Sequence, residues 1–453
     1  MMEPNGPLST NTATRREFLY TLAAQPARRP NVLLLLADQW RAQTLPMAGD
    51  EDLQAPNLAR LGSDSVTFSR AYAAYPLCSP SRASILTGRF PHACRVPGNN
   101  WALAAEEPSL AALLAGAGYR TGYIGKWHLD GEANPGFVPP GERRFGFQYW
   151  AAFNRGHRYY DSVYFRDTPE PVKGPGFEPD YQTALAASFI RQNREQPFFL
   201  FVSWGPPHTP RRPPERFAQM YDAKRFQLRA NVPDDYQAKA REGYAGYYGL
   251  CSAVDHNVGL LLDTLDAERL TRDTIVVFTA DHGDLLGSHG LEFKNEPYEE
   301  SARVPLVVRY PGRMKGGTQS DALVSLVDLA PTLASLCGVT PPDAIQGVDH
   351  SASFTSGSGP RAESVYGEGK LGQEGEWRMI VRGADKLVVN RGMEPSHLYN
   401  LAQDPFEMDN LMGRRDQRTK TDELRALLRR WMLRTSDRVP YPMPRRREAK
   451  EAV

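Results

Sequence analysis

Short apolar runs alternate along the chain with segments of helical periodicity. The apolar runs predict buried strands over residues 31–37, 119–124, 198–204, 274–279 and 304–309. Helical periodicity between them predicts helices over residues 108–117, 184–192 and 247–265. Gly118 is a stop signal for the first of these helices. Strands that alternate with helices indicate an α/β layered fold with a mainly parallel sheet.

The pattern changes after about residue 356. Short segments over 364–367, 377–382 and 386–390 predict antiparallel strands, and residues 421–433 predict a closing amphipathic helix. We therefore expect a small α+β subdomain, joined through the linker SGSGP at 356–360. The expected division is a leader over 1–29, a main domain over 30–355, and a C-terminal subdomain with tail over 356–453.

Polar clusters follow four of the predicted strands. They are Asp38 with Gln39, Lys126 with His128, His208 alone, and Asp281 with His282. In α/β folds with parallel sheets, ligands bind beyond the carboxyl ends of the strands. Four clusters at one edge of a sheet predict a single site.

Composition narrows the class of protein. The chain has 453 residues, with 54 Lys plus Arg against 53 Asp plus Glu, so the formal net charge is +1. That balance gives no sign of a nucleic-acid or anionic-membrane partner. The apolar run near the start, residues 32–37, is too short to cross a bilayer. Four cysteines in a chain this long do not make a disulfide scaffold, and no pair of them has zinc-ligand spacing. We expect three of them to be buried apolar residues.

The segment TRREFL at 14–19 resembles a twin-arginine export signal. The apolar stretch behind it, residues 18–24, is only a minimal signal core and is broken by Gln25 and Pro26. The signal is partial. Export to the periplasm and a solvated leader on a cytoplasmic protein both stay open.

The most informative segment is LCSPSRASILTGR at 77–89. Cys78, Pro80, Ser81 and Arg82 match the pattern C-x-P-S-R, and A-x-x-x-T-G-R follows it. The segment resembles the signature of the type I, formylglycine-dependent sulfatases of the alkaline phosphatase superfamily. Further blocks similar to that family follow in order, namely GYIGKWHL, SWGPPHTP, TADHGDLLGSHG and FKNEPYEESARVPLVVRYPG. The resemblance runs from residue 29 to about residue 411.

The resemblance implies a fold and an activity. The fold is an alkaline-phosphatase-like sandwich, with a large mostly parallel sheet between helices and a small C-terminal α+β subdomain with an antiparallel sheet. In that scheme residues 30–355 form the sulfatase catalytic domain. The activity is hydrolysis of a sulfate monoester, with a sulfated carbohydrate as the expected substrate class.

In that family a formylglycine-generating enzyme or an anaerobic maturase oxidises the signature cysteine to formylglycine, which implies the same for Cys78. A hydrated aldehyde offers two hydroxyls on one carbon, so one attacks sulfur and the other later expels the sulfate. Residues from Ser79 onward can start a helix, which places residue 78 at a helix N-terminus where anions are favoured. Arg82, about one turn on, is expected to steady the hydrate oxygens.

The resemblance also implies a metal site. Asp38, Gln39, Asp281 and His282 match the family's ligand positions, with residue 78 completing the set. Carboxylate and amide oxygens suit Ca²⁺. The family commonly has a second Asp where this chain has Gln39, and the lost charge leaves Mg²⁺ or Mn²⁺ open.

Lys126, His128, His208 and Lys294 match the family's sulfate-contacting and acid/base positions. The lysines would neutralise sulfate oxygens, His208 would protonate the departing alcohol, and His128 would deprotonate the second hydroxyl. Polar and aromatic residues in nearby loops could grip a sugar ring, namely Asn100, Trp101, His157 and Arg158, although ordinary loop chemistry explains them equally well.

Two other functions stay open. Some phosphonate monoester and phosphodiester hydrolases with the same formylglycine site carry Asp-Gln like Asp38-Gln39. A catalytically silent glycan-binding protein would keep Cys78 as a thiol.

Overall fold

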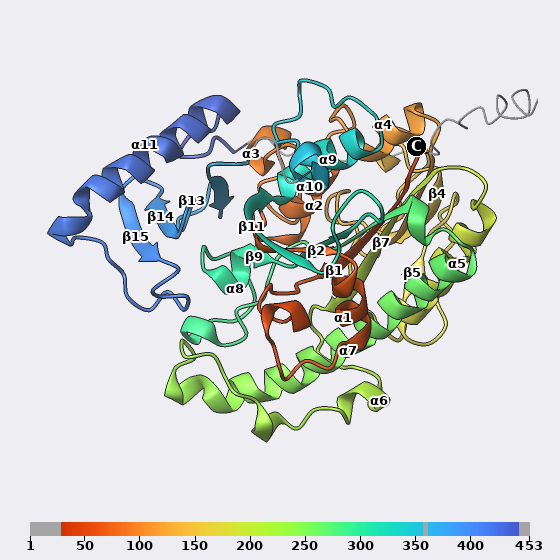
Figure 1. Cartoon of the computed structure of the whole chain (residues 1–453), viewed down its shortest axis with the longest axis horizontal. Coiled ribbons are helices and arrows are strands. Elements are labelled where there is room, and N and C mark those ends of the chain that lie inside the picture. The colour runs from red at the N-terminus through yellow and green to blue at the C-terminus, as the bar shows by residue number, and fades with distance from the viewer. Residues whose placement is uncertain (1–28, 357–360, 444–453) are drawn as a thin grey trace, which may run out of the picture.

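The computed structural model describes residues 29–356 and 361–443 (Figure 1). The leader with its arginine pair and the last four residues of the SGSGP linker, 357–360, lie outside the described residues. The domain boundaries expected at 29 and 356 therefore stay predictions.

One large sheet organises the main body. Its nine strands run in the order β11-β2-β10-β8-β1-β7-β3-β4, with β9 paired to β2. Every pairing is parallel except those of β9 and β10. The strands are β1 (Asn31–Asp38), β2 (Val66–Tyr72), β3 (Arg120–Lys126), β4 (Tyr149–Phe153), β7 (Phe198–Pro207), β8 (Thr274–Ala280), β9 (Arg303–Val304), β10 (Leu306–Arg309) and β11 (Thr318–Ser325).

The centre of the sheet is β8-β1-β7, and every residue of these three strands is buried. Such strands need apolar side chains on both faces, which is why their sequences NVLLLLAD, FFLFVSWGPP and TIVVFTA show no alternation. The corresponding sequence predictions are confirmed.

Helices cover both faces of the sheet. Figure 1 shows α1, α5 and α7 on one side and α2, α4, α9 and α10 on the other. The helices are α1 (Pro56–Ser63), α2 (Cys78–Thr87), α3 (Pro91–Cys94), α4 (Leu110–Gly116), α5 (Glu178–Gln192), α6 (Glu215–Ala218), α7 (Gln237–Ala267), α8 (Glu299–Ala302), α9 (Leu329–Leu336), α10 (Ser351–Ser356) and α11 (Arg418–Thr435).

The three helices predicted for this domain are α4, α5 and α7. Ser109 caps α4 by accepting bonds from the backbone of its first turn, and Gly118 follows the helix with φ +87°. Helix α7 begins at Gln237, ten residues before the predicted start. Its first turns are partly exposed and polar, so they lack the apolar period that marks the rest.

The strand predicted over 304–309 is two strands. Pro305 has no N–H to donate and separates β9 from β10. Strands β2, β4 and β11 were not predicted. The sequences of β2 and β11, VTFSRAY and TQSDALVS, carry exposed polar residues that hide the strand pattern.

The C-terminal region forms a separate antiparallel sheet in the order β12-β13-β14-β15, with α11 packed against β13 and β14 (Figure 1). Its strands are β12 (Val365–Gly369), β13 (Trp377–Arg382), β14 (Asp385–Asn390) and β15 (Pro395–Asn400). A two-stranded ribbon, β5 (Val163–Tyr164) with β6 (Val172–Lys173), lies beyond β4. The predicted fold class, including the small antiparallel sheet, is confirmed.

Two further expectations concern cysteines and membranes. Cys94, Cys251 and Cys337 are buried and free, as predicted. Within residues 29–356 and 361–443, no helix combines the length and apolar character needed to cross a bilayer.

Candidate active site

The four polar clusters meet at one edge of the large sheet. Asp38 ends β1, Lys126 ends β3, His208 follows β7 and Asp281 follows β8. These strands are neighbours in the order β8-β1-β7-β3 and run parallel, so their carboxyl ends lie side by side.

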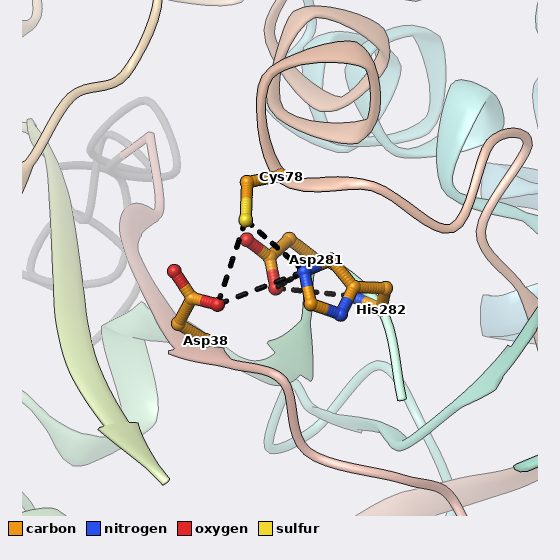
Figure 2. A group of neighbouring side chains, drawn as sticks. All are labelled: Asp38, Cys78, Asp281 and His282. Atoms are coloured by element: carbon orange, nitrogen blue, oxygen red, sulfur yellow. Dashed lines mark hydrogen bonds and ion pairs between the residues drawn. The ribbon is translucent and has the colours of Figure 1, made fainter. Parts of the chain in front are cut away.

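Cys78, the first residue of α2, faces this edge. Figure 2 shows its thiol pointing into the space between Asp38, Asp281 and His282. The Cys78 Sγ lies 3.3 Å from His282 Nε2 and 3.9 Å from Asp38 Oδ1. The same Nε2 lies 3.6 Å from Asp38 Oδ1 and 3.5 Å from Asp281 Oδ1. All four side chains are buried, and one donor atom from each lies within 4.8 Å of the others.

The chemistry of this donor set fits a divalent metal ion. His282 Nδ1 is 2.9 Å from the carbonyl of Gly283, so it carries the proton and the Nε2 lone pair faces two carboxylates. A lone pair and two anionic oxygens gathered in a buried space repel one another unless a cation lies among them. Without a metal ion, a proton on Nε2 relieves the same repulsion, and the negative surroundings, chiefly Asp281, outweigh burial and raise the pKa of His282.

Arg82 ties the cluster together. Its Nε donates to Asp281 Oδ2 (2.9 Å) and its Nη2 to Asp38 Oδ2 (3.0 Å). Its Nη1 donates to the carbonyl of Lys126 (2.8 Å) and to Ser203 Oγ (2.7 Å). We expected Arg82 to steady oxygens on residue 78. In the structure its three nitrogens bond the two carboxylates, β3 and β7, so Arg82 fixes the positions of Asp38 and Asp281, and its contact with oxygens on residue 78 stays a prediction.

Two lysines reach the cluster by different routes. Lys126 Nζ donates directly to Asp38 Oδ2 at 2.5 Å. Although burial opposes it, the charges of Lys126 and Arg82 hold the pKa of Asp38 well below its usual range. Lys294 Nζ instead donates to the side-chain oxygen of Gln39.

Gln39 occupies the position where the resemblance predicts a metal ligand. Its backbone N–H donates to Asp281 Oδ1 (3.0 Å), and its side-chain Nε2 donates to Asp284 Oδ2 (2.7 Å). Arg211 Nη2 donates to the same Asp284 oxygen (2.8 Å). Sequence reasoning missed Asp284 and Arg211. The signal for Asp284 was its place in TADHGDLLGSHG, three residues after Asp281.

Two of the predicted histidines line the site. His128 is 4% exposed, and neither ring nitrogen has a hydrogen-bond partner among the described residues. His208 Nδ1 donates to the carbonyl of Thr209 (2.7 Å), so its Nε2 carries the lone pair. Burial and the charge of Lys126 hold the pKa of His128 well below its usual range, and burial and Lys294 do so for His208. Both rings are neutral at pH 7.

The N-terminus of α2 is held by a residue that sequence reasoning did not single out as a cap. The backbone N–H of Ser79 donates to Asn99 Oδ1 at 3.1 Å.

Burial and Asp38 act to raise the pKa of the Cys78 thiol, but Lys126, Lys294 and His282 outweigh them and the pKa is lowered.

The four weaker substrate candidates separate in the structure. His157 reaches the site, with its Nε2 3.2 Å from Lys126 Nζ. Asn100 is exposed and accepts a bond from Arg155 Nη1 (2.9 Å). Trp101 is partly buried against the main core, and Arg158 is exposed.

Two family models match the chain. The model described as Sulfatase matches residues 30–339, and the model described as N-sulphoglucosamine sulphohydrolase, C-terminal, matches residues 287–434. Among curated proteins, an ulvan-active sulfatase of Formosa agariphila is 32% identical over 421 residues, covering 90% of this chain and 82% of that protein.

Solved structures agree with this assignment. A putative sulfatase from Bacteroides fragilis superposes with a TM-score of 0.86 at 28% identity, covering 93% of this chain and 98% of that one. A protein solved with its substrate D-glucosamine-2-N,6-O-disulfate has a TM-score of 0.82 at 25% identity, covering 92% and 100%. A phosphonate monoester hydrolase of Agrobacterium radiobacter has a TM-score of 0.75 at 25% identity, covering 90% and 96%.

The sequence motif, the fold and the matched models agree over most of the chain. The chain belongs to the sulfatase family and is a sulfuric ester hydrolase.

Proposed function

We propose that the protein hydrolyses a sulfate monoester carried by a carbohydrate. The observation that carries this proposal is the buried group of Asp38, Cys78, Asp281 and His282 beside the ammonium of Lys126. A metal-donor set with two carboxylates, a helix N-terminus and a cationic side chain together suit the developing charge of a sulfuryl group.

We propose Ca²⁺ as the resident ion, with Mg²⁺ and Mn²⁺ as alternatives. Asp38, Asp281 and His282 would hold it. The side-chain oxygen of Gln39, which accepts a hydrogen bond from Lys294 in this structure, would give up that bond and become a further ligand. When bound, the ion supplies a positive charge that favours an ionised oxygen nucleophile.

Removal of the ion provides a direct test. Elemental analysis should find about one divalent ion per chain, and a chelator should lower both activity and melting temperature. Asp281→Asn should lose the ion. Arg89→Met, which alters a pair outside the cluster, should keep it. A protein that is fully active and metal-free would contradict the proposal.

Cys78 is proposed to be converted to formylglycine by a formylglycine-generating enzyme or an anaerobic maturase. Support comes from the C-x-P-S-R motif and from the position of Cys78 at the first turn of α2, facing the metal donors. When present, the hydrated aldehyde supplies an oxygen nucleophile with its own route for releasing sulfate.

Side chains around it take the remaining roles. Lys126 and Lys294 neutralise sulfate oxygens, His208 Nε2 protonates the departing alcohol, and His128 removes the proton that releases sulfate. Lys294 helps to keep His208 neutral in the free protein. An anionic sulfate group beside Lys294 would offset that charge, so that His208 can hold the proton it donates.

A carbohydrate is proposed as the alcohol because the ulvan-active sulfatase and the glucosamine-disulfate complex are relatives of this chain. Asn100, Trp101, His157 and Arg158 are proposed to contact the sugar. The test is desulfation of an array of sulfated glycans by protein co-expressed with a maturation enzyme. Cys78→Ala, which should fold normally, serves as the inactive control.

A phosphonate monoester or phosphodiester hydrolase is the second candidate. Gln39 in place of a second carboxylate favours it, as does the similarity to the Agrobacterium enzyme. Turnover of aryl sulfate, phosphodiester and phosphonate esters should be compared under one condition. Sulfate ester turnover that is negligible beside phosphodiester turnover would replace the first proposal by this one.

Mass spectrometry of the peptide across Cys78 tests the maturation step. The aldehyde mass is expected after co-expression. A thiol mass together with retained glycan binding would instead favour a silent glycan-binding protein.

Export through the twin-arginine route is proposed from Arg15 and Arg16 alone. Fractionation of cells that express the wild-type chain and Arg15→Lys/Arg16→Lys should show loss of the periplasmic form. Equal distribution of both proteins would favour a cytoplasmic enzyme.

A further inference from the structure

His157 lies flat against His208 in the proposed site. The two ring centroids are 3.7 Å apart and the rings are inclined by only 2°. His157 Nε2 also lies 3.2 Å from Lys126 Nζ. One side chain therefore contacts both the proposed proton donor, which follows β7, and a proposed sulfate-binding lysine, which ends β3.

The contact with Lys126 fixes the protonation of the His157 ring. An ammonium group can only donate, so Nε2 must accept and the ring proton must be on Nδ1. That Nδ1 is buried and has no hydrogen-bond partner among the described residues. A buried N–H without an acceptor is rare in folded proteins unless a ligand supplies the acceptor.

The loop that carries His157 is held firmly. Asn154 Nδ2 donates to the carbonyls of Gly131 (3.1 Å) and Ala133 (3.0 Å), and Asn154 Oδ1 accepts from Asp130 N–H (3.1 Å). On the other side, the Tyr159 hydroxyl donates to the carbonyl of His208 at 2.6 Å. The segment carrying His157 and the segment carrying His208 are thus joined by a hydrogen bond as well as by the ring stack.

We propose that His157 positions Lys126 and the ring of His208 for ester cleavage and donates its Nδ1–H to an oxygen of the bound substrate. This inference rests on the proposed sulfatase function and assigns His157 a task beyond general contact with a sugar. The stack keeps His208 Nε2 directed at the leaving oxygen. The bond to Nε2 holds Lys126 against rotation.

Two substitutions separate these tasks. His157→Gln loses the stacked ring but leaves an amide, whose oxygen can accept from Lys126 and whose nitrogen can donate to the substrate. A misplaced His208 matters most when the leaving alcohol is a poor one, because such alcohols need the proton. His157→Gln should therefore lower kcat/KM at least tenfold for a sugar or phenyl sulfate, and less than threefold for 4-nitrophenyl sulfate.

His157→Phe keeps a stacked ring but loses both nitrogens. This variant lacks both the acceptor for Lys126 and the donor to the substrate, whichever ester is bound. It should therefore lower kcat/KM by a similar factor, about tenfold, across the whole series of leaving groups. His397→Phe is the matched control, because His397 is also a partly buried histidine stacked on an aromatic ring, Tyr399, but lies on β15 of the small sheet. It should stay within twofold of wild type.

Retention of wild-type kcat/KM by both His157 variants, in a protein that cleaves sulfate esters, would overturn the inference while leaving the proposed function intact. A wild-type protein that cleaves no sulfate ester would instead overturn the proposed function. The ring protonation provides a measurement that does not depend on activity. ¹⁵N NMR of histidine-labelled protein should show His157 protonated at Nδ1, identified by loss of the signal in either variant. Protonation at Nε2 would overturn the inference.

Discussion

At the scale of single residues, the site depends on buried charges that compensate one another. Asp38 and Asp281 share Arg82, and all three side chains are at most 2% exposed. Buried ion pairs of this kind are costly to break, because the partner left behind keeps a charge that water cannot reach.

Arg82→Met should therefore destabilise the fold by about 3–5 kcal/mol and abolish turnover. Unfolding in denaturant measures the first effect and aryl sulfate hydrolysis the second. Arg89→Met is the control, because Arg89 pairs with Glu107 at a partly exposed position, and it should cost about 1 kcal/mol or less. Equal losses for the two variants would contradict the role given to Arg82.

Glu178 provides a pH-dependent test. Burial raises its pKa to about 8, so the folded protein holds a proton there that the unfolded chain loses above pH 4.5. Because the pKa of Glu178 is higher in the folded state than in the unfolded chain, its contribution to the free energy of unfolding is fully present below pH 4.5. That contribution is lost as pH rises through 8. The melting temperature of wild type should therefore fall relative to that of Glu178→Gln between pH 5 and pH 8.5. A constant difference between the two proteins would show that Glu178 does not titrate as described.

At the scale of elements, the start of α2 determines where residue 78 lies. The cap from Asn99 to the Ser79 N–H joins the first turn of the helix to the loop that follows α3. This bond joins residues that are 20 positions apart in the sequence. It fixes the direction in which the first turn of α2 points toward the proposed metal donors.

Asn99→Ala should cost about 1 kcal/mol of stability, the usual effect of losing a side-chain cap. The variant should lower kcat by a larger factor than it changes KM. The first turn of α2 changes direction, whereas the lysines proposed to bind sulfate keep their positions. Asn100→Ala, which removes an exposed side chain that accepts a hydrogen bond from Arg155, should leave stability unchanged within about 0.5 kcal/mol. Thermal unfolding and steady-state kinetics of both variants check the expectation.

At the scale of the whole molecule, a buried ion network joins the small sheet to the main body. Lys386 of β14 is fully buried, and its Nζ lies 3.1 Å from Glu299 of α8 and 2.7 Å from Glu407. Burial and the neighbouring carboxylates, opposed by Lys386, raise the pKa of Glu407 to about 7.

Lys386→Met should destabilise the protein by about 3–5 kcal/mol, because two buried carboxylates lose their partner. Adding Glu407→Gln should restore part of that loss, since it removes one of the unpaired charges. Denaturant unfolding of the two single variants and the double variant measures the coupling. Simple additivity would show that the residues do not form one network.

The sequence predicted the strands that are buried on both faces and the polar residues at their ends, because continuous apolar runs and a family motif are local signals. It did not predict the contacts that give the site its detail. Gln39 meets Asp284 245 residues away, and the stack of His157 on His208 joins two loops. Such pairs depend on the order of the strands in the sheet, and no local sequence pattern encodes that order. The antiparallel strand β10, inserted between β8 and β2, is an example.

Cys78 is 2% exposed in the finished fold, in the first turn of its helix. A second enzyme has no access to a sulfur atom enclosed in this way, so the proposed conversion of the thiol has to precede the folding of residues 77–89. Under the proposed conversion to formylglycine, chains that fold before Cys78 is modified would stay inactive, and slower synthesis or cooler growth should raise the active fraction.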